Sequence, residues 1–107
     1  MIAQTIGRAR DGDRVVVVTR SISEARELFA ELAFEAPDFD KNKALMQIAT
    51  PERGMVWFES ERSPGLLRGR FADVVLVTDP AILTRDFVRL AAPVLATAVA
   101  PILGVLL

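Results

Sequence analysis

Thr78 and Asp79 are the residues of this chain best placed to do chemistry, because they end the apolar run "DVVLVT" at 73–78. A carboxylate at the end of a buried strand can bind Mg²⁺ or act as a base. Pro80 follows Asp79 directly, and Asp is a preferred helix N-cap when Pro takes the first helical position. We therefore interpret Asp79 as a cap and expect no catalytic residue.

Three arginines precede this strand in a polar turn, at Arg62, Arg68 and Arg70. Guanidinium groups could grip a phosphate or a partner, or act on a phosphate in trans. The alternative is a solvated turn in which the arginines pair with Glu59 or Glu61. The pattern favours the solvated turn but leaves both interpretations open.

Composition excludes several classes of function. The chain has 107 residues, enough for one domain, and its 13 basic and 14 acidic residues leave a net charge of -1. Such a balance gives no broad attraction to nucleic acid, so any DNA binding should be weak and salt-sensitive. With no Cys and no His, thiolate metal sites, disulfides and His-based catalysis are excluded. We expect neither a cofactor nor a metal.

The last 18 residues, Leu90–Leu107, carry no charge and reach the length of a membrane span. Pro93, Pro101 and Gly104 interrupt this segment, so we interpret it as a buried helix followed by a buried strand. The opening residues "MIAQTIGRARDGD" lack the apolar core of a signal peptide. We therefore expect a cytoplasmic protein of a bacterial host, without membrane association.

Hydrophobic periodicity predicts alternating helices and strands. The expected elements are a helix at 2–10, a strand at 14–19, a helix at 21–34 with a Ser21/Glu24 capping box, a polar loop at 35–44, a hairpin of strands 44–50 and 54–60, a strand at 73–78, a helix from Pro80 that bends at Pro93, and a strand at 101–107. This order predicts an α/β fold: a single three-layer domain with a mainly parallel sheet, helices on both faces and a short β-hairpin.

The order of motifs resembles the ATPase core of the large terminase subunit, the DNA-packaging motor of tailed bacteriophages, within the RecA-like family. The turn Ser63-Pro64-Gly65-Leu66-Leu67-Arg68-Gly69 and the acid-ended strand "ADVVLVTDP" carry the resemblance, which covers nearly the whole chain, 1–107. It implies a truncated RecA-like sheet in which this strand stands at the Walker B position.

The sequence departs from the family in its nucleotide-binding elements. It contains no Gly-x-x-x-x-Gly-Lys-Ser/Thr loop to cradle phosphates, and it begins where the helix after that loop would be. Thr78-Asp79 stands where the family has Asp-Glu, and a Thr hydroxyl is a weaker Mg²⁺ ligand than a carboxylate. We therefore expect that the lone chain does not hydrolyse ATP.

Three functions are consistent with these observations. The favoured one is a non-catalytic phage or prophage protein, derived from a terminase ATPase core, that acts by binding another protein. The second is a fragment of a split terminase ATPase complemented in trans. The third is a small membrane-anchored protein that uses the apolar tail 90–107.

The resemblance also implies an open sheet edge. In RecA-like sheets the strand matching "PILGVLL" lies between the phosphate-loop strand and the Walker B strand, and only the second neighbour is present here. We expect Ile102, Leu103, Val105 and Leu106 to form an interface with a second chain, most simply another copy in a homodimer. The alternative is that the N-terminal segment or a helix covers the edge.

Overall fold

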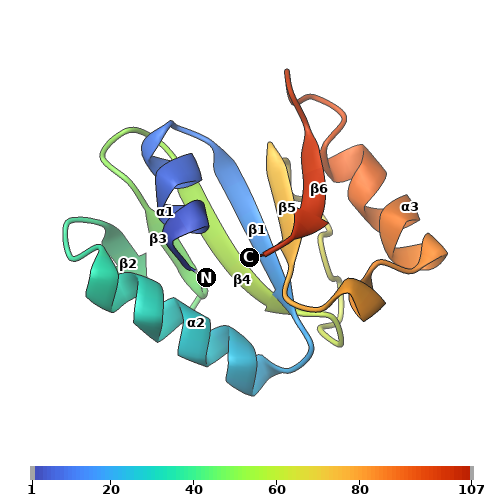
Figure 1. Ribbon diagram of the computed structural model, residues 1–107, viewed down its shortest axis with the longest axis horizontal. Coiled ribbons are helices and arrows are strands. Elements are labelled where there is room, and N and C mark those ends of the chain that lie inside the picture. Colours follow the sequence, from blue (N-terminus) through green and yellow to red (C-terminus); the bar gives the residue numbers. More distant parts are fainter. Residues whose placement is uncertain (1, 107) are drawn as a thin grey trace.

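The protein is described by a computed structural model that covers residues 2–106. Its elements in chain order are α1 (Ile2–Arg10), β1 (Arg14–Thr19), α2 (Ile22–Glu35), β2 (Asp40–Asn42), β3 (Gln47–Ala49), β4 (Met55–Ser60), β5 (Val74–Val77), the 3-10 helix η1 (Pro80–Ile82), α3 (Arg85–Val94) and β6 (Ile102–Val105). Figure 1 shows them arranged as helices around a central twisted sheet.

Among residues 2–106, the sheet has six strands in the order β2-β3-β4-β1-β5-β6. β1 lies at its centre and pairs in parallel with β4 and with β5, and β5 in turn pairs in parallel with β6. β3 pairs antiparallel with both β2 and β4, which confirms the predicted hairpin. The mainly parallel α/β sheet predicted from the sequence is therefore confirmed.

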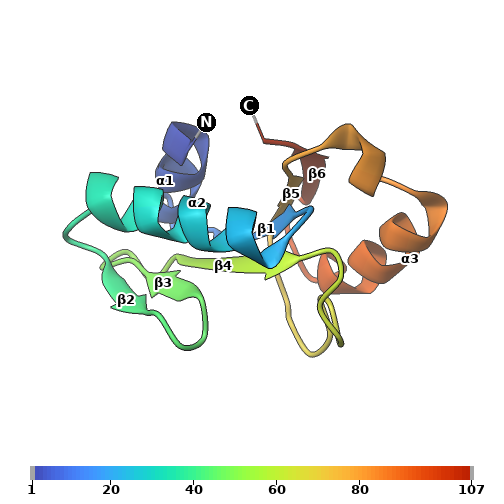
Figure 2. The same cartoon turned by 90° about the horizontal axis from the view of Figure 1, so that it is seen from below.

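Two apolar cores lie on opposite faces of this sheet. The first joins α1 and α2 to one set of alternating strand residues, including Val15 and Val17 of β1. The second joins α3 and the arginine-bearing turn to the other set, including Val16 and Val18. All four valines are buried because helices cover β1 from both sides. Figure 2 shows α1 and α2 on one face and α3 beyond the twisted strands β5 and β6, which confirms the three layers.

Helix α1 is fixed to the turn between β3 and β4. The carbonyl oxygen of Ala9 accepts a hydrogen bond of 3.2 Å from Thr50 Oγ1, and the same hydroxyl accepts one of 2.8 Å from the N–H of Gly54. A Cβ atom at Gly54 would lie only 2.1 Å from the Ala9 carbonyl oxygen. The close approach of helix and turn therefore requires glycine at this position.

Four expected elements differ from those observed. The polar loop predicted at 35–44 contains the exposed strand β2, and the strand expected at 44–50 is shortened to β3. The helix expected from Pro80 onward is two elements, because η1 ends at Ile82 and Thr84 caps the separate helix α3. The final strand ends at Val105, and the predicted strand residue Leu107 lies outside the described residues.

The uncharged C-terminal segment does not form one long helix. It is divided between the last turns of α3, a connection at 95–101 and β6. Among residues 2–106, no helix has both the length and the apolar character needed to cross a membrane.

Candidate functional site

The carboxyl ends of the parallel strands bring one group of polar residues together. β1, β4 and β5 all run in the same direction, so Arg20, Glu61 and Thr78 leave the sheet at the same edge. The N-terminus of α2 begins at this edge too, two residues after Arg20. Ligands of open α/β sheets bind outside the carboxyl ends of the strands. This edge is therefore the first place to look for nucleotide chemistry.

Glu24 connects this edge to α2. The predicted cap is present, because the N–H of Glu24 donates to Ser21 Oγ at 3.1 Å. The carboxylate, however, accepts from the N–H of Arg20 at 3.1 Å and from Thr78 Oγ1 at 2.7 Å. The Thr78 hydroxyl thus donates its hydrogen bond to a carboxylate within the same chain.

Arg20 joins the remaining two carboxylates of the edge. Its Nε lies 3.2 Å from Glu61 Oε2 and 3.9 Å from Asp79 Oδ2. Asp79 also accepts a hydrogen bond of 2.9 Å from the N–H of Ala81, which places it as the cap of η1 as predicted. We call Arg20, Glu24, Glu61, Thr78 and Asp79 the carboxyl-edge cluster.

The carboxyl-edge cluster is closed by its own contacts. Each of its acidic side chains has a partner in the chain, and within residues 2–106 no group of three His, Cys, Asp or Glu residues is placed to hold a metal ion. These contacts link the ends of β1, β4 and β5 to the start of α2, and we call this structural role a clasp.

Sequence reasoning placed two members of this cluster, Thr78 and Asp79, at the end of the strand, and it did not place Arg20, Glu24 or Glu61 beside them. The signal for them was present. Arg20 and Glu61 each follow a predicted strand directly, and parallel strand ends share one edge of a sheet. The capping box already accounted for Glu24, so its hydrogen bond from Thr78 was not predicted.

The three arginines of the turn at 61–71 do not form one site. Arg70 Nη2 lies 3.4 Å from Glu59 Oε1, and its guanidinium stacks 5.1 Å from the centroid of the Trp57 ring. Arg62 and Arg68 are exposed. Arg70 therefore takes the pairing with Glu59 that the sequence allowed, while the phosphate or partner contact by Arg62 and Arg68 stays a prediction.

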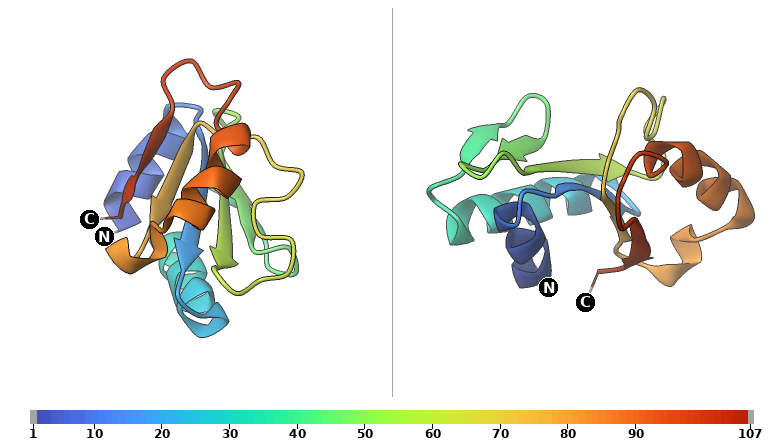
Figure 3. Two further views of the ribbon diagram at one scale, coloured as in Figure 1. Left: turned by 90° about the vertical axis from the view of Figure 1, so that its right-hand side faces the viewer. Right: turned by 90° about the horizontal axis from the view of Figure 1, so that it is seen from above.

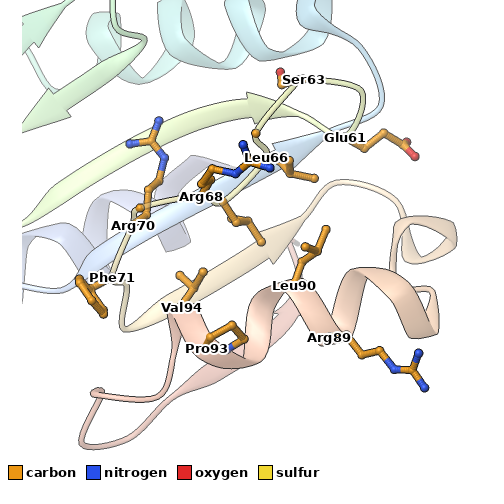
Figure 4. A pocket seen from close by; sticks show the side chains of 13 residues that line it. Glu61, Ser63, Leu66, Arg68, Arg70, Phe71, Arg89, Leu90, Pro93 and Val94 are labelled. Carbon is orange, nitrogen blue, oxygen red and sulfur yellow. The ribbon is translucent and has the colours of Figure 1, made fainter.

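A groove of about 580 Å³ separates this turn from α3. Figure 4 shows Leu66, Leu90 and Val94 along it, with Arg70 pointing away from α3. The turn is held by Leu67, which is buried although its φ is 63°, in the left-handed region that a branched side chain rarely adopts. Burial of Leu67 in the second core stabilises this conformation.

The outer side of β6 is the open edge of the sheet. No strand among residues 2–106 lies beyond β6, and the N-terminal residues form α1 on one face instead of a covering strand (Figure 3). The N–H of Ile102 donates to the carbonyl of Asp73, just before β5, at 3.1 Å, and the N–H of Leu106 donates to the carbonyl of Val77 in β5 at 2.8 Å. Because backbone groups alternate along a strand, those of Leu103 and Val105 point outward.

The predicted interface residues of β6 are divided between the two cores. Ile102 and Leu106 pack against the first core, and Leu103 and Val105 against the second. Every residue of β6 is half-buried, whereas every residue of β5 is buried. Both cores therefore extend to this edge and remain partly exposed there.

Two carboxyl groups with shifted pKa lie away from the carboxyl-edge cluster. Burial raises the pKa of Asp13, which precedes β1, and the nearby Asp73 carboxylate raises it further. The hydrogen bonds from Arg10, at 3.0 and 3.1 Å, lower the pKa of Asp38. Both groups belong to structural contacts around the amino end of β1 and the loop after α2.

Comparisons with known proteins identify the fold. No protein-family model and no curated protein matches the chain. Among solved structures, the large terminase of a thermophilic bacteriophage aligns with 94% of this chain and 28% of its own, at a TM-score of 0.72 and 12% identity. The same protein in complex with ATP-γ-S gives a TM-score of 0.69 at 12% identity, over 94% of this chain and 27% of its own.

A mutant of the ATPase domain of the large terminase of a Thermus phage is also similar. It aligns with 97% of this chain and 50% of its own length, at a TM-score of 0.65 and 13% identity. The chain therefore has the fold of a phage large-terminase ATPase core and spans half or less of the length of these proteins. The resemblance stated from the sequence is confirmed at the level of the fold.

Proposed function

We propose that this protein is a non-catalytic module built on the terminase ATPase fold, and that it acts by binding another polypeptide along β6. The open edge of β6 is the observation that carries the proposal. Its outward N–H and C=O groups need partners, and its half-buried side chains extend two apolar cores to the surface. Such an edge binds an added strand through main-chain hydrogen bonds and apolar contacts.

The opposite edge of the sheet supports this choice of surface. β2 is short and fully exposed, and it carries Asp40 and Lys41. Short charged edge strands discourage pairing with other chains. β6 has no charged residue, so its outer side lacks this protection.

The carboxyl-edge cluster supports the absence of catalysis. The hydroxyl of Thr78 donates to Glu24, and Arg20 lies between Glu61 and Asp79. A Mg²⁺ site would require free oxygen ligands at this position. The sequence also lacks the Gly-x-x-x-x-Gly-Lys-Ser/Thr loop that would hold the phosphates.

Nucleotide binding by the purified chain tests the non-catalytic half of the proposal. Isothermal titration with Mg·ATP should give no measurable heat of binding, and a phosphate-release assay should give no turnover above buffer. Micromolar affinity for Mg·ATP, or turnover that is lost when Thr78 or Asp79 is changed, would contradict it.

A split ATPase completed in trans is the second candidate. The open edge of β6 supports it too, and a protein of the same fold has been solved with ATP-γ-S. The gene neighbourhood separates the two candidates. If a neighbouring gene encodes a chain with a phosphate loop, ATP turnover that appears only when both chains are mixed would favour the split enzyme.

A further inference from the structure

We infer that the partner of β6 is β6 of a second copy, paired antiparallel with Gly104 opposite Gly104. The inference rests on the proposed function, since it names the occupant of the same edge. A two-fold axis normal to the sheet brings the same edge of two copies together and makes the joined strands antiparallel. The result is one continuous sheet through both protomers.

Within residues 102–106, this register pairs the backbone groups of β6 that point away from β5. Leu103 and Val105 carry the outward N–H and C=O groups, because Ile102 and Leu106 donate inward, toward β5. With Gly104 on the axis, Leu103 of one copy faces Val105 of the other, and the reverse. Every outward donor and acceptor of these two residues then has a partner.

Pro101 disfavours the register in which Leu103 of one copy lies opposite Leu103 of the other. Proline has no N–H and occupies the next outward position before Leu103. A shift that sets Leu103 against Leu103 places Val105 opposite Pro101, so the Val105 carbonyl receives no hydrogen bond. The Gly104-centred pairing leaves no such group unpaired within 102–106.

The side chains of β6 also suit its own copy as a partner. The incoming strand must be apolar on both faces, because both cores reach this edge. β6 meets that requirement, since Ile102 and Leu106 serve one face and Leu103 and Val105 the other. In the Gly104-centred register each apolar side chain meets an apolar side chain on the same face.

Cysteine cross-linking reads the register directly, because the chain has no cysteine of its own. Gly104→Cys fits the fold, since a Cβ atom at Gly104 meets nothing within 4 Å. Directly opposed Cα atoms in a non-hydrogen-bonded antiparallel pair lie about 4.5 Å apart, within the range of a disulfide. Diagonal positions lie about 7–8 Å apart, which is at or beyond its limit.

Gly104→Cys should therefore form a disulfide-linked dimer on mild oxidation, while Leu103→Cys alone and Val105→Cys alone should not. A mixture of these two variants should cross-link as a heterodimer.

Val99→Cys is the collision control, because Val99 is fully exposed and lies outside the strand. The yield for Gly104→Cys should exceed the control at least about tenfold, as expected when pairing raises the local thiol concentration toward the millimolar range. Gly104→Ser, which has no thiol, should match the wild type in size by light scattering.

Three results would overturn the inference: equal yields for Gly104→Cys and Val99→Cys, self-cross-linking mainly at Leu103 or at Val105, or a wild-type chain that stays monomeric at high concentration. None of them touches the proposed function, because the edge remains available to a strand of another protein. Binding of Mg·ATP, in contrast, would contradict the proposed non-catalytic role and would leave the inferred pairing of β6 unaffected.

Discussion

Replacing Thr78 by Val tests whether the carboxyl-edge cluster is a structural clasp. Val keeps the shape of Thr but removes the hydroxyl that donates to Glu24 Oε1 at 2.7 Å. Hydrogen bonds to charged groups contribute about 1.5–3 kcal/mol each. Glu24 keeps its bond from the Arg20 N–H, so the lower end of this range applies and we expect a loss of about 1.5 kcal/mol.

Thermal and urea unfolding measure this loss. For a domain of this size, a change of about 1.5 kcal/mol lowers Tm by about 6 °C. Thr78→Ser is the matched control, because it keeps the donor and should lose much less. A double-mutant cycle with Glu24→Gln should give a coupling of about 1 kcal/mol, since Gln accepts hydrogen bonds without the negative charge.

Two outcomes would refute the clasp. One is a Thr78→Val protein that unfolds at the wild-type temperature. The other is strict additivity of Thr78→Val and Glu24→Gln, which would show that the negative charge of Glu24 does not strengthen its contact with the Thr78 hydroxyl in solution. Either result would leave Thr78 free for another role.

Two further predictions concern stability. Gly54→Ala places a Cβ atom 2.1 Å from a carbonyl oxygen of α1, so backbone must move and the free energy of unfolding should fall by about 2–4 kcal/mol, measured by urea titration against Gly7→Ala, a position where a Cβ atom meets nothing within 4 Å. Loss of at most a few tenths of a kcal/mol would contradict the close approach. Asp38→Asn should remove an acid-dependent part of stability: because Arg10 lowers the pKa of Asp38 below its ordinary value of 3.8, the ion pair stabilises the fold above pH 3.8 and is lost as the pH falls through the lowered pKa. The difference in unfolding free energy between wild type and Asp38→Asn should therefore shrink below that pH, and a constant difference would contradict the pairing.

The sequence was sufficient for the elements whose burial shows in their composition. "RVVVVT" is apolar through most of its length because helices cover β1 on both faces, and Ser21 marks the start of α2 through its cap. β2 could not be found in this way. Its residues Asp40–Asn42 are all exposed, so no burial pattern marks them, and only pairing with β3 makes them a strand.

The site was only partly predictable for a related reason. The capping role of Asp79 is local, so its neighbour Pro80 was enough to predict it. The contact between Glu24 and Thr78 joins residues 54 positions apart, and it depends on which strand lies beside β1. Local sequence patterns do not show which strands are neighbours in the sheet. The shared direction of parallel strands does show that the residues following β1, β4 and β5 lie at the same end of the sheet.

Amide hydrogen exchange along β6 tests the central claim most directly. If β6 binds a second polypeptide, the outward N–H groups of Leu103 and Val105 should exchange quickly in dilute, monomeric protein and slowly once the protein is assembled, while Ile102 and Leu106, which donate toward β5, should be protected in both states. Protection of Leu103 and Val105 in the monomer would show that the chain covers its own edge. Rapid exchange of both amides in the assembled protein would place the contact elsewhere and contradict the account.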